Sequence, residues 1–123
     1  MNDVNNWNIT IKAGETLRET FKLKNDDGSP VKLTGATGVC QIRKNARSAE
    51  ALASPSLTVI DADNGEMKVE LAAAISRTLP TTGVSITQED AWVWDAFITY
   101  SDGTVECLWD GEFRVRPRVT QNE

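Results

Sequence analysis

The strongest constraint on the fold is an alternation of apolar and polar residues that recurs along the chain with a period of two. Trp7, Ile9 and Ile11 alternate with polar residues near the N-terminus, and the same alternation returns in the segments Met67–Leu71 and Ala91–Tyr100. Successive side chains of a β-strand point to opposite faces, so this pattern is typical of strands with one buried and one solvated face. The sequence therefore predicts a protein built mainly from short β-strands.

Clusters of turn-forming residues separate these segments. The cluster Asn25–Pro30, the pair Asn64-Gly65 and the triplet Ser101–Gly103 combine glycine, which accepts positive φ, with residues that favour turns. Asn-Gly and Asp-Gly between alternating segments are strong hairpin signals. Strands are therefore expected at 7–12, 17–24, 39–43, 57–60, 66–71, 91–100, 104–109 and 112–115, with a break or bulge at Asp110-Gly111.

Two features interrupt this regular pattern. Glu19 is a polar residue at a position where the alternation of its strand calls for an apolar one, so either one inward position is polar or the strand bends there. The segment 72–79 is the single stretch with helical composition, and Pro80 ends it. The segments 45–55 and 81–90 lack a strand pattern and are expected to be loops.

The number of strands and their spacing favour an antiparallel sandwich or barrel of about seven to eight strands, with one short helix near 72–79. A chain of 123 residues without internal repeats or a linker forms one domain, which we place at 1–123. The ends, 1–5 and 120–123, are polar and are expected to be flexible tails.

The residue composition excludes most common types of catalytic site. The chain has no histidine and two cysteines. Triads that use histidine as the base are therefore excluded, as are zinc sites with histidine ligands, and two cysteines cannot build an all-cysteine site. Cys40 and Cys107 fall in expected strands, where small buried thiols are common. We expect no enzymatic activity, no cofactor, no metal and no small-molecule substrate.

Charge and hydropathy exclude two further classes of partner. The net charge is −5, from 13 basic and 18 acidic residues, whereas phosphate backbones need a basic face. No apolar run reaches the roughly 18 residues of a membrane span. The start, Met1–Asn6, lacks the basic and apolar regions of a signal peptide. Binding to nucleic acid or membranes and secretion are therefore not expected.

The segment Ala91–Ile98 is apolar on both sides. Trp92 and Trp94 share one face with later apolar residues, whereas Val93 and Phe97 lie on the other. Such a strand is either covered on both faces, by the second sheet and by a loop or helix, or exposes one face to a partner. Exposed tryptophans would be natural anchors of an interface.

Arginines alternate on the outward side of the last strand, at Arg114, Arg116 and Arg118. They either form a solvated edge that discourages aggregation or pair with an acidic neighbour in an assembly. The candidate interface therefore comprises Trp92, Trp94, Phe97, Arg114, Arg116 and Arg118.

An ordered set of turn and strand motifs resembles small virion proteins of tailed bacteriophages, which are similar to the immunoglobulin-like N-terminal domain of phage upper baseplate proteins. The segment Asp27–Ala36 resembles their "DG-x-P-(V/I)-DLTG" turn, although Lys32 replaces the usual aspartate. The other matching segments are Trp7–Gly14, Ile42-Arg43, Gly65–Leu71, Leu79-Pro80, Trp94-Asp95, Asp102-Gly103 and Gly111–Thr120. The segments 46–54 and 81–90 depart from the pattern.

The resemblance implies an immunoglobulin-like β-sandwich that serves as a structural component of a virion, in the tail, baseplate, neck or head decoration. Its partners would be other virion proteins and copies of itself. It would be located in the virion and, during assembly, in the host cytoplasm. A second hypothesis is a carbohydrate- or ligand-binding sandwich that uses surface tryptophans as a stacking platform.

Overall fold

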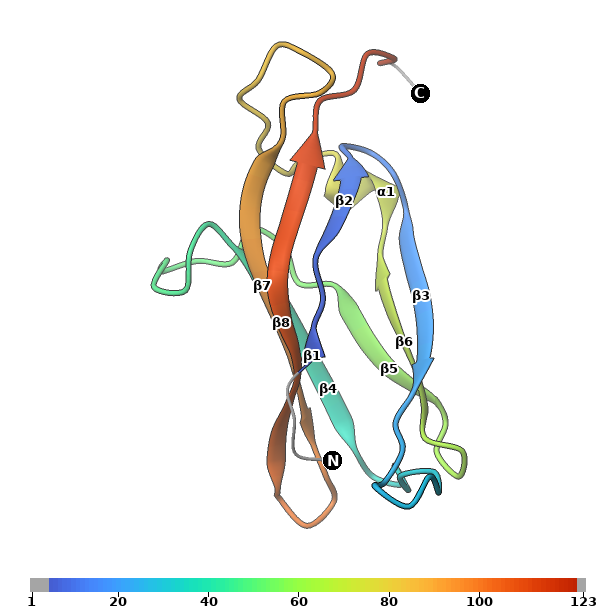
Figure 1. Cartoon of the computed structure of the whole chain (residues 1–123). Coiled ribbons are helices and arrows are strands. Elements are labelled where there is room, and N and C mark those ends of the chain that lie inside the picture. Colours follow the sequence, from blue (N-terminus) through green and yellow to red (C-terminus); the bar gives the residue numbers. More distant parts are fainter. Residues whose placement is uncertain (1–4, 122–123) are drawn as a thin grey trace.

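The computed structural model describes residues 5–121. In this part, the chain forms eight strands and one short helix (Figure 1). They are β1 (Asn5–Asn6), β2 (Ile9–Lys12), β3 (Leu17–Lys22), β4 (Thr37–Arg43), β5 (Ser56–Asp61), β6 (Glu66–Leu71), α1 (Ala73–Ser76), β7 (Asp90–Thr99) and β8 (Val105–Arg116).

The strands form two sheets that pack face to face (Figure 1). The larger sheet has the order β1-β8-β7-β4, with β2 also paired to β8, and the smaller sheet has the order β3-β6-β5. If β3 to β8 are read as strands B to G, this is the division of an immunoglobulin domain into B-E-D and C-F-G sheets. The chain is therefore an immunoglobulin-like β-sandwich, as predicted.

The first strands join the sheet of the last strand and run parallel to it. Ile9 lies beside Phe113 and Ile11 beside Val115, whereas the other strand pairs are antiparallel. The larger sheet is thus mixed rather than purely antiparallel. The alternation within a strand determines its buried face but not the direction of its neighbour, so this pairing was not visible in the sequence.

The short segment between β1 and β2, Trp7-Asn8, packs closely against β7 and β8 and holds the N-terminal edge in place. The indole Nε1 of Trp94 donates to the carbonyl oxygen of Trp7 at 2.7 Å, and the Glu112 N–H donates to Oδ1 of Asn8 at 2.8 Å. A Cβ atom at Gly111 would collide with the Trp7 carbonyl oxygen. Glycine at this position therefore allows the two backbones to approach closely.

The last strand, β8, is continuous over 12 residues, so there is no break at Asp110-Gly111, and the bulge that the sequence allowed there lies two residues earlier. Ala96 lies opposite Trp109, whereas Phe97 lies opposite Cys107, and Leu108 is therefore the extra residue of a β-bulge. The bulge explains why two consecutive residues, Leu108 and Trp109, are both buried.

The core lies between the two sheets and follows the predicted alternation. Trp94, Ala96 and Ile98 fill the inner face of β7, and Met67 and Val69 of β6 are fully buried in the opposite sheet. The remaining large core residues include Leu17, Leu23, Leu33, Ile42, Leu57, Leu71, Leu108, Trp109, Phe113 and Val115.

The helix is shorter than the predicted 72–79 and covers one end of the sandwich (Figure 1). The segments 45–55 and 81–89 form loops, apart from an isolated bridge between Ile42 and Ala53. The tails expected at 1–5 and 120–123 lie mostly outside the described residues. Asn5, the first described residue, lies in β1 and pairs with Trp109 of β8.

Candidate interaction surface on the larger sheet

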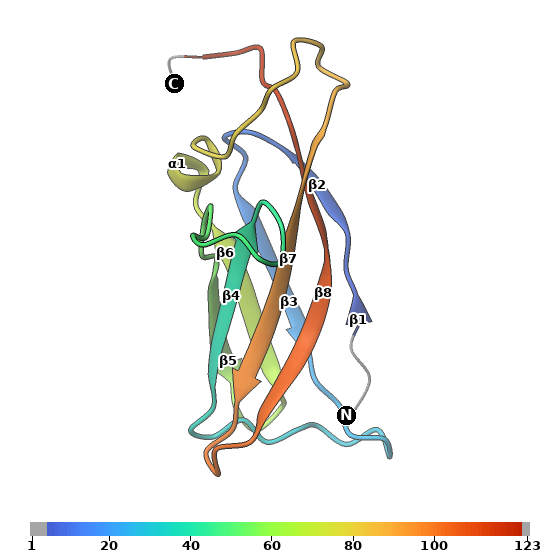
Figure 2. The same ribbon diagram turned by 90° about the vertical axis from the view of Figure 1, so that its left-hand side faces the viewer.

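The outer face of the larger sheet points away from the smaller sheet, and Figure 2 shows it with β4, β7 and β8 side by side. In the same view, α1 lies at one end of the sandwich, so no helix of the described chain covers this face. The pairing register places on it Val39, Gln41, Arg43, Val93, Asp95, Phe97, Val105, Cys107, Asp110, Glu112, Arg114 and Arg116.

Three exposed apolar side chains form an apolar patch on this face: Val39, Phe97 and Val105. Val39 lies directly opposite Phe97 and is 54% exposed, whereas Phe97 is 36% exposed. Val105, which is 58% exposed, is the diagonal neighbour of Phe97 on β8. Sequence analysis found Phe97 alone. Val39 could have been found from its phase, since it alternates with the buried Cys40.

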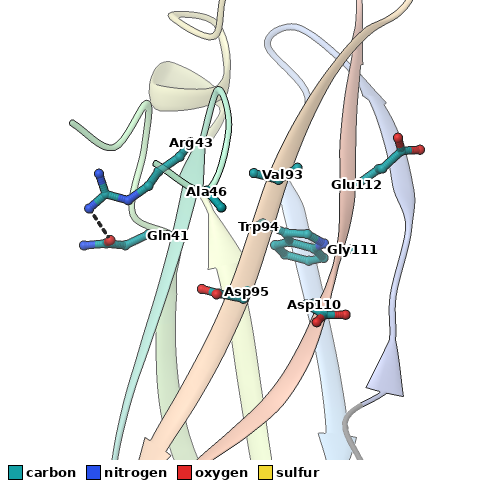
Figure 3. A pocket seen from close by; sticks show the side chains of 9 residues that line it. All are labelled: Gln41, Arg43, Ala46, Val93, Trp94, Asp95, Asp110, Gly111 and Glu112. Atoms are coloured by element: carbon teal, nitrogen blue, oxygen red, sulfur yellow. Dashed lines mark hydrogen bonds between the residues drawn. The ribbon is translucent and has the colours of Figure 1, made fainter. Parts of the chain in front are cut away.

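Two carboxylates, Asp95 and Asp110, form an acidic pair beside the apolar patch. They lie directly opposite each other on β7 and β8 (Figure 3). Within the described residues, neither carboxylate makes a hydrogen bond or a salt bridge. Partial burial, and then the charge of Asp110, raise the pKa of Asp95 above its usual value, although Arg43 opposes this shift. The acidic pair is therefore a concentration of negative charge that Arg43 compensates only in part.

A hollow of about 590 Å³ surrounds the acidic pair (Figure 3). Arg43 lines this hollow, but its guanidinium points away from Asp95 in Figure 3. It donates to Oε1 of Gln41 at 2.8 Å and to the carbonyl oxygen of Ser48 at 2.8 Å. The nearest basic side chain is therefore committed to the chain's own loop and does not bind the acidic pair.

The three predicted arginines do not form one stripe. Arg114 donates to Oε1 of Glu112 at 2.7 Å and to Oε1 of Glu89 at 3.1 Å, and Arg116 donates to the carbonyl oxygen of Ile86 at 2.7 Å. These bonds attach the loop before β7 to the outer face. Arg118 follows the end of β8 and packs against the turn at residues 13–15.

All four tryptophans belong to the core or pack against it. Trp94 is 2% exposed and Trp109 is 3% exposed, so both indoles are buried in the core. Trp92, at the end near the helix, is half-buried and donates to the carbonyl oxygen of Pro80 at 3.3 Å. Trp7 is also half-buried, and its ring centroid lies 4.8 Å from that of Trp109. Of the predicted interface aromatics, Phe97 is therefore the one on the outer face.

The two cysteines lie on strands that flank β7 and face in opposite directions. Cys40 is buried in the core, and burial together with the charge of Asp95 raises its pKa to about 12. Cys107 faces outward, and its pKa is also raised, first by partial burial and then by the charges of Asp95 and Asp110. A reactive thiolate needs a lowered pKa, so neither environment activates the sulfur.

Within residues 5–121, no group of three or more metal-ligating side chains could hold a metal ion. No helix in this part of the chain is long and apolar enough to cross a membrane.

No family model matches the sequence, and no curated protein matches it. Among solved structures, the chain is similar to CopC from Methylosinus trichosporium OB3b, with 15% identity and a TM-score of 0.44, over 92% of this chain and 87% of that one. It is also similar to murine CRIg, with 9% identity and a TM-score of 0.37, over 91% of this chain and 92% of that one. The strand order of the chain itself shows the immunoglobulin-like arrangement.

Proposed function

We propose that this chain is a non-enzymatic structural component of a tailed-phage virion, and that it binds a neighbouring virion protein through the outer face. The observation that carries the contact role is the uncovered apolar patch Val39, Phe97 and Val105. Exposed apolar side chains rimmed by polar ones are typical of protein–protein sites, and an aromatic residue often dominates the binding energy. The virion assignment is supported by the ordered turn motifs of the sequence.

The acidic pair favours a basic partner over a second copy on this face. If two copies met here about a two-fold axis that passes through the acidic pair, the Asp95 and Asp110 carboxylates of both would approach one another and repel. A partner that carries a lysine or arginine beside apolar side chains would satisfy both the acidic pair and the apolar patch. Copies of this chain would then be arranged around the particle by that partner.

The test compares Phe97→Asp with Val84→Asp in purified particles. Val84 is 99% exposed on the loop before β7, outside the apolar patch, and therefore provides a matched control. A charge at the centre of a contact is expected to cost at least about 2 kcal/mol, or roughly 30-fold in affinity. Quantitative mass spectrometry should therefore find Phe97→Asp depleted from particles and Val84→Asp present at the normal copy number. Circular dichroism would confirm that both variants fold.

Two results would contradict the proposal in different ways. If the unsubstituted chain is absent from purified particles, the virion assignment is wrong. If Phe97→Asp folds and is incorporated as well as Val84→Asp, the chain belongs to the particle but the outer face is not its contact surface.

A further inference from the structure

A second hollow lies on another side of the molecule, where the edges of the two sheets face each other. Here β1 of the larger sheet faces β3 of the smaller sheet (Figure 1). We call this hollow, of about 470 Å³, the seam groove. It is lined by Asn5, Asn6, Trp7, Glu19, Thr20, Phe21, Lys22, Leu23, Leu108 and Trp109.

Aromatic rings form much of the seam groove. The ring centroids of Trp7 and Trp109 are 4.8 Å apart with an interplanar angle of 73°, and those of Phe21 and Trp109 are 5.4 Å apart at 86°. Trp7 and Phe21 are half-buried, whereas Trp109 is buried. The near-perpendicular packing fixes the rings against one another, and the accessible parts of Trp7 and Phe21 belong to the wall of the groove.

Glu19 places a carboxylate beside these rings. Along β3, its phase is that of Leu17, Phe21 and Leu23, which point toward the other sheet, yet Glu19 is exposed because the seam is open there. Within the described residues, its carboxylate makes no hydrogen bond or salt bridge. Glu19, which interrupts the alternation of the sequence, thus places an unpaired negative charge at an aromatic groove.

The one basic residue of the groove lining does not neutralise Glu19. Lys22 has the opposite phase on β3 and therefore points to the outer side of the smaller sheet, where its charge lowers the pKa of Asp61. The lining thus combines aromatic rings with one free carboxylate.

We propose that the seam groove binds a small organic cation, with its ammonium group against Trp7 and Phe21 and close to the Glu19 carboxylate. Aromatic rings attract ammonium groups through their negative faces, and quaternary ammonium ions are bound in this way in proteins. The carboxylate adds charge complementarity that a purely apolar pocket would lack. This site is separate from the outer face, so it does not rest on the proposed function.

The test titrates the full chain with choline and with its neutral isostere 3,3-dimethyl-1-butanol. Tryptophan fluorescence and the NMR signals of the indole N–H groups report on Trp7 and Trp109. Choline is expected to bind saturably and at least about fivefold more tightly than the alcohol, since the shared shape isolates the charge. n-Butylammonium, the end of a lysine side chain, shows whether the groove prefers a quaternary or a primary ammonium group.

The variant Glu19→Gln separates this proposal from a simpler role of Glu19 in preventing edge-to-edge association of β3. It is expected to reduce choline affinity about fivefold, to that of the neutral alcohol, whereas Glu50→Gln, at an exposed acid outside the groove, leaves affinity unchanged. Equal binding of choline and the alcohol, no saturable response, or unchanged choline affinity in a folded Glu19→Gln variant would each overturn the proposal.

Discussion

A single buried hydroxyl joins the short helix to the turn between β2 and β3. Ser76 Oγ donates to the carbonyl oxygen of Glu15 at 2.7 Å and accepts from the Gly14 N–H at 3.0 Å. The Ser76 side chain is fully buried, so its hydroxyl makes these bonds out of contact with water. Two hydrogen bonds of Ser76 therefore attach the four-residue helix α1 to the end of the sandwich.

Replacing Ser76 with alanine should lower the free energy of unfolding by about 1–3 kcal/mol, because the variant removes both hydrogen bonds of a fully buried hydroxyl. Urea unfolding followed by tryptophan fluorescence measures this change. Ser54→Ala, at an exposed serine, is the control and should change stability by less than about 0.5 kcal/mol. Equal stabilities for the two variants would mean that the Ser76 hydroxyl bonds are replaced by water at no cost.

At the level of single strands, the alternation predicted most of what the structure contains. It correctly placed Trp94, Ala96 and Ile98 on one face of β7 and Phe97 on the other, because the direction of a strand's side chains is a local property, but it did not show which face is buried. It did not reveal that Trp92 and Trp94 are covered by their own chain, because cover depends on the position of distant elements.

The acidic pair could not be predicted, because it depends on a bulge. Counting back from the turn that pairs Thr99 with Val105, a regular hairpin would place Asp95 opposite Trp109. The extra residue Leu108 shifts the register by one, so that Asp95 faces Asp110. A bulge changes which residues meet without changing the alternation on either side of it, and so leaves little trace in the sequence.

The acidic pair has a consequence for the pH dependence of stability. Partial burial, and then Asp110, raise the pKa of Asp95 in the folded chain. The Asp95 carboxyl therefore binds a proton more readily in the folded state than in the unfolded state. The charged form of Asp95 destabilises the fold at pH values above its folded pKa, and this destabilisation fades as the pH falls through that pKa. Asp95→Asn should thus raise stability at neutral pH by about 0.2–1 kcal/mol and by nearly nothing at about pH 3.

Asp102→Asn provides a control with the opposite sign. The Thr104 N–H donates to Oδ1 of Asp102 at 2.9 Å, and this bond lowers the pKa of Asp102. That variant should lose stability at neutral pH, and the loss should disappear in acid. Thermal unfolding between about pH 3 and pH 7 measures both variants. A stability gain from Asp95→Asn that does not depend on pH would show that Asp95 acts through its shape rather than its charge.

On the scale of the whole molecule, the two ends of the chain close the larger sheet. The pairing of Ile11 with Val115 joins residues from opposite ends of the sequence, whereas β5 and β6 form a local hairpin in which Val59 lies opposite Met67. Closing a long loop costs more conformational entropy than closing a short one. We therefore expect the local hairpin to form before the parallel pair that completes the sandwich.

This order of events predicts different kinetic effects for two core truncations of similar size. Ile11→Ala and Met67→Ala both remove buried side chains and should each destabilise the chain by about 2–4 kcal/mol. If β2 docks after the rate-limiting step, Ile11→Ala leaves the refolding rate nearly unchanged and accelerates unfolding about 30-fold per 2 kcal/mol, whereas Met67→Ala slows refolding. Stopped-flow tryptophan fluorescence across a denaturant series separates the two rates. If Ile11→Ala slows refolding as much as Met67→Ala, the ends of the chain already meet in the transition state, and closure of the larger sheet is part of nucleation rather than its last step.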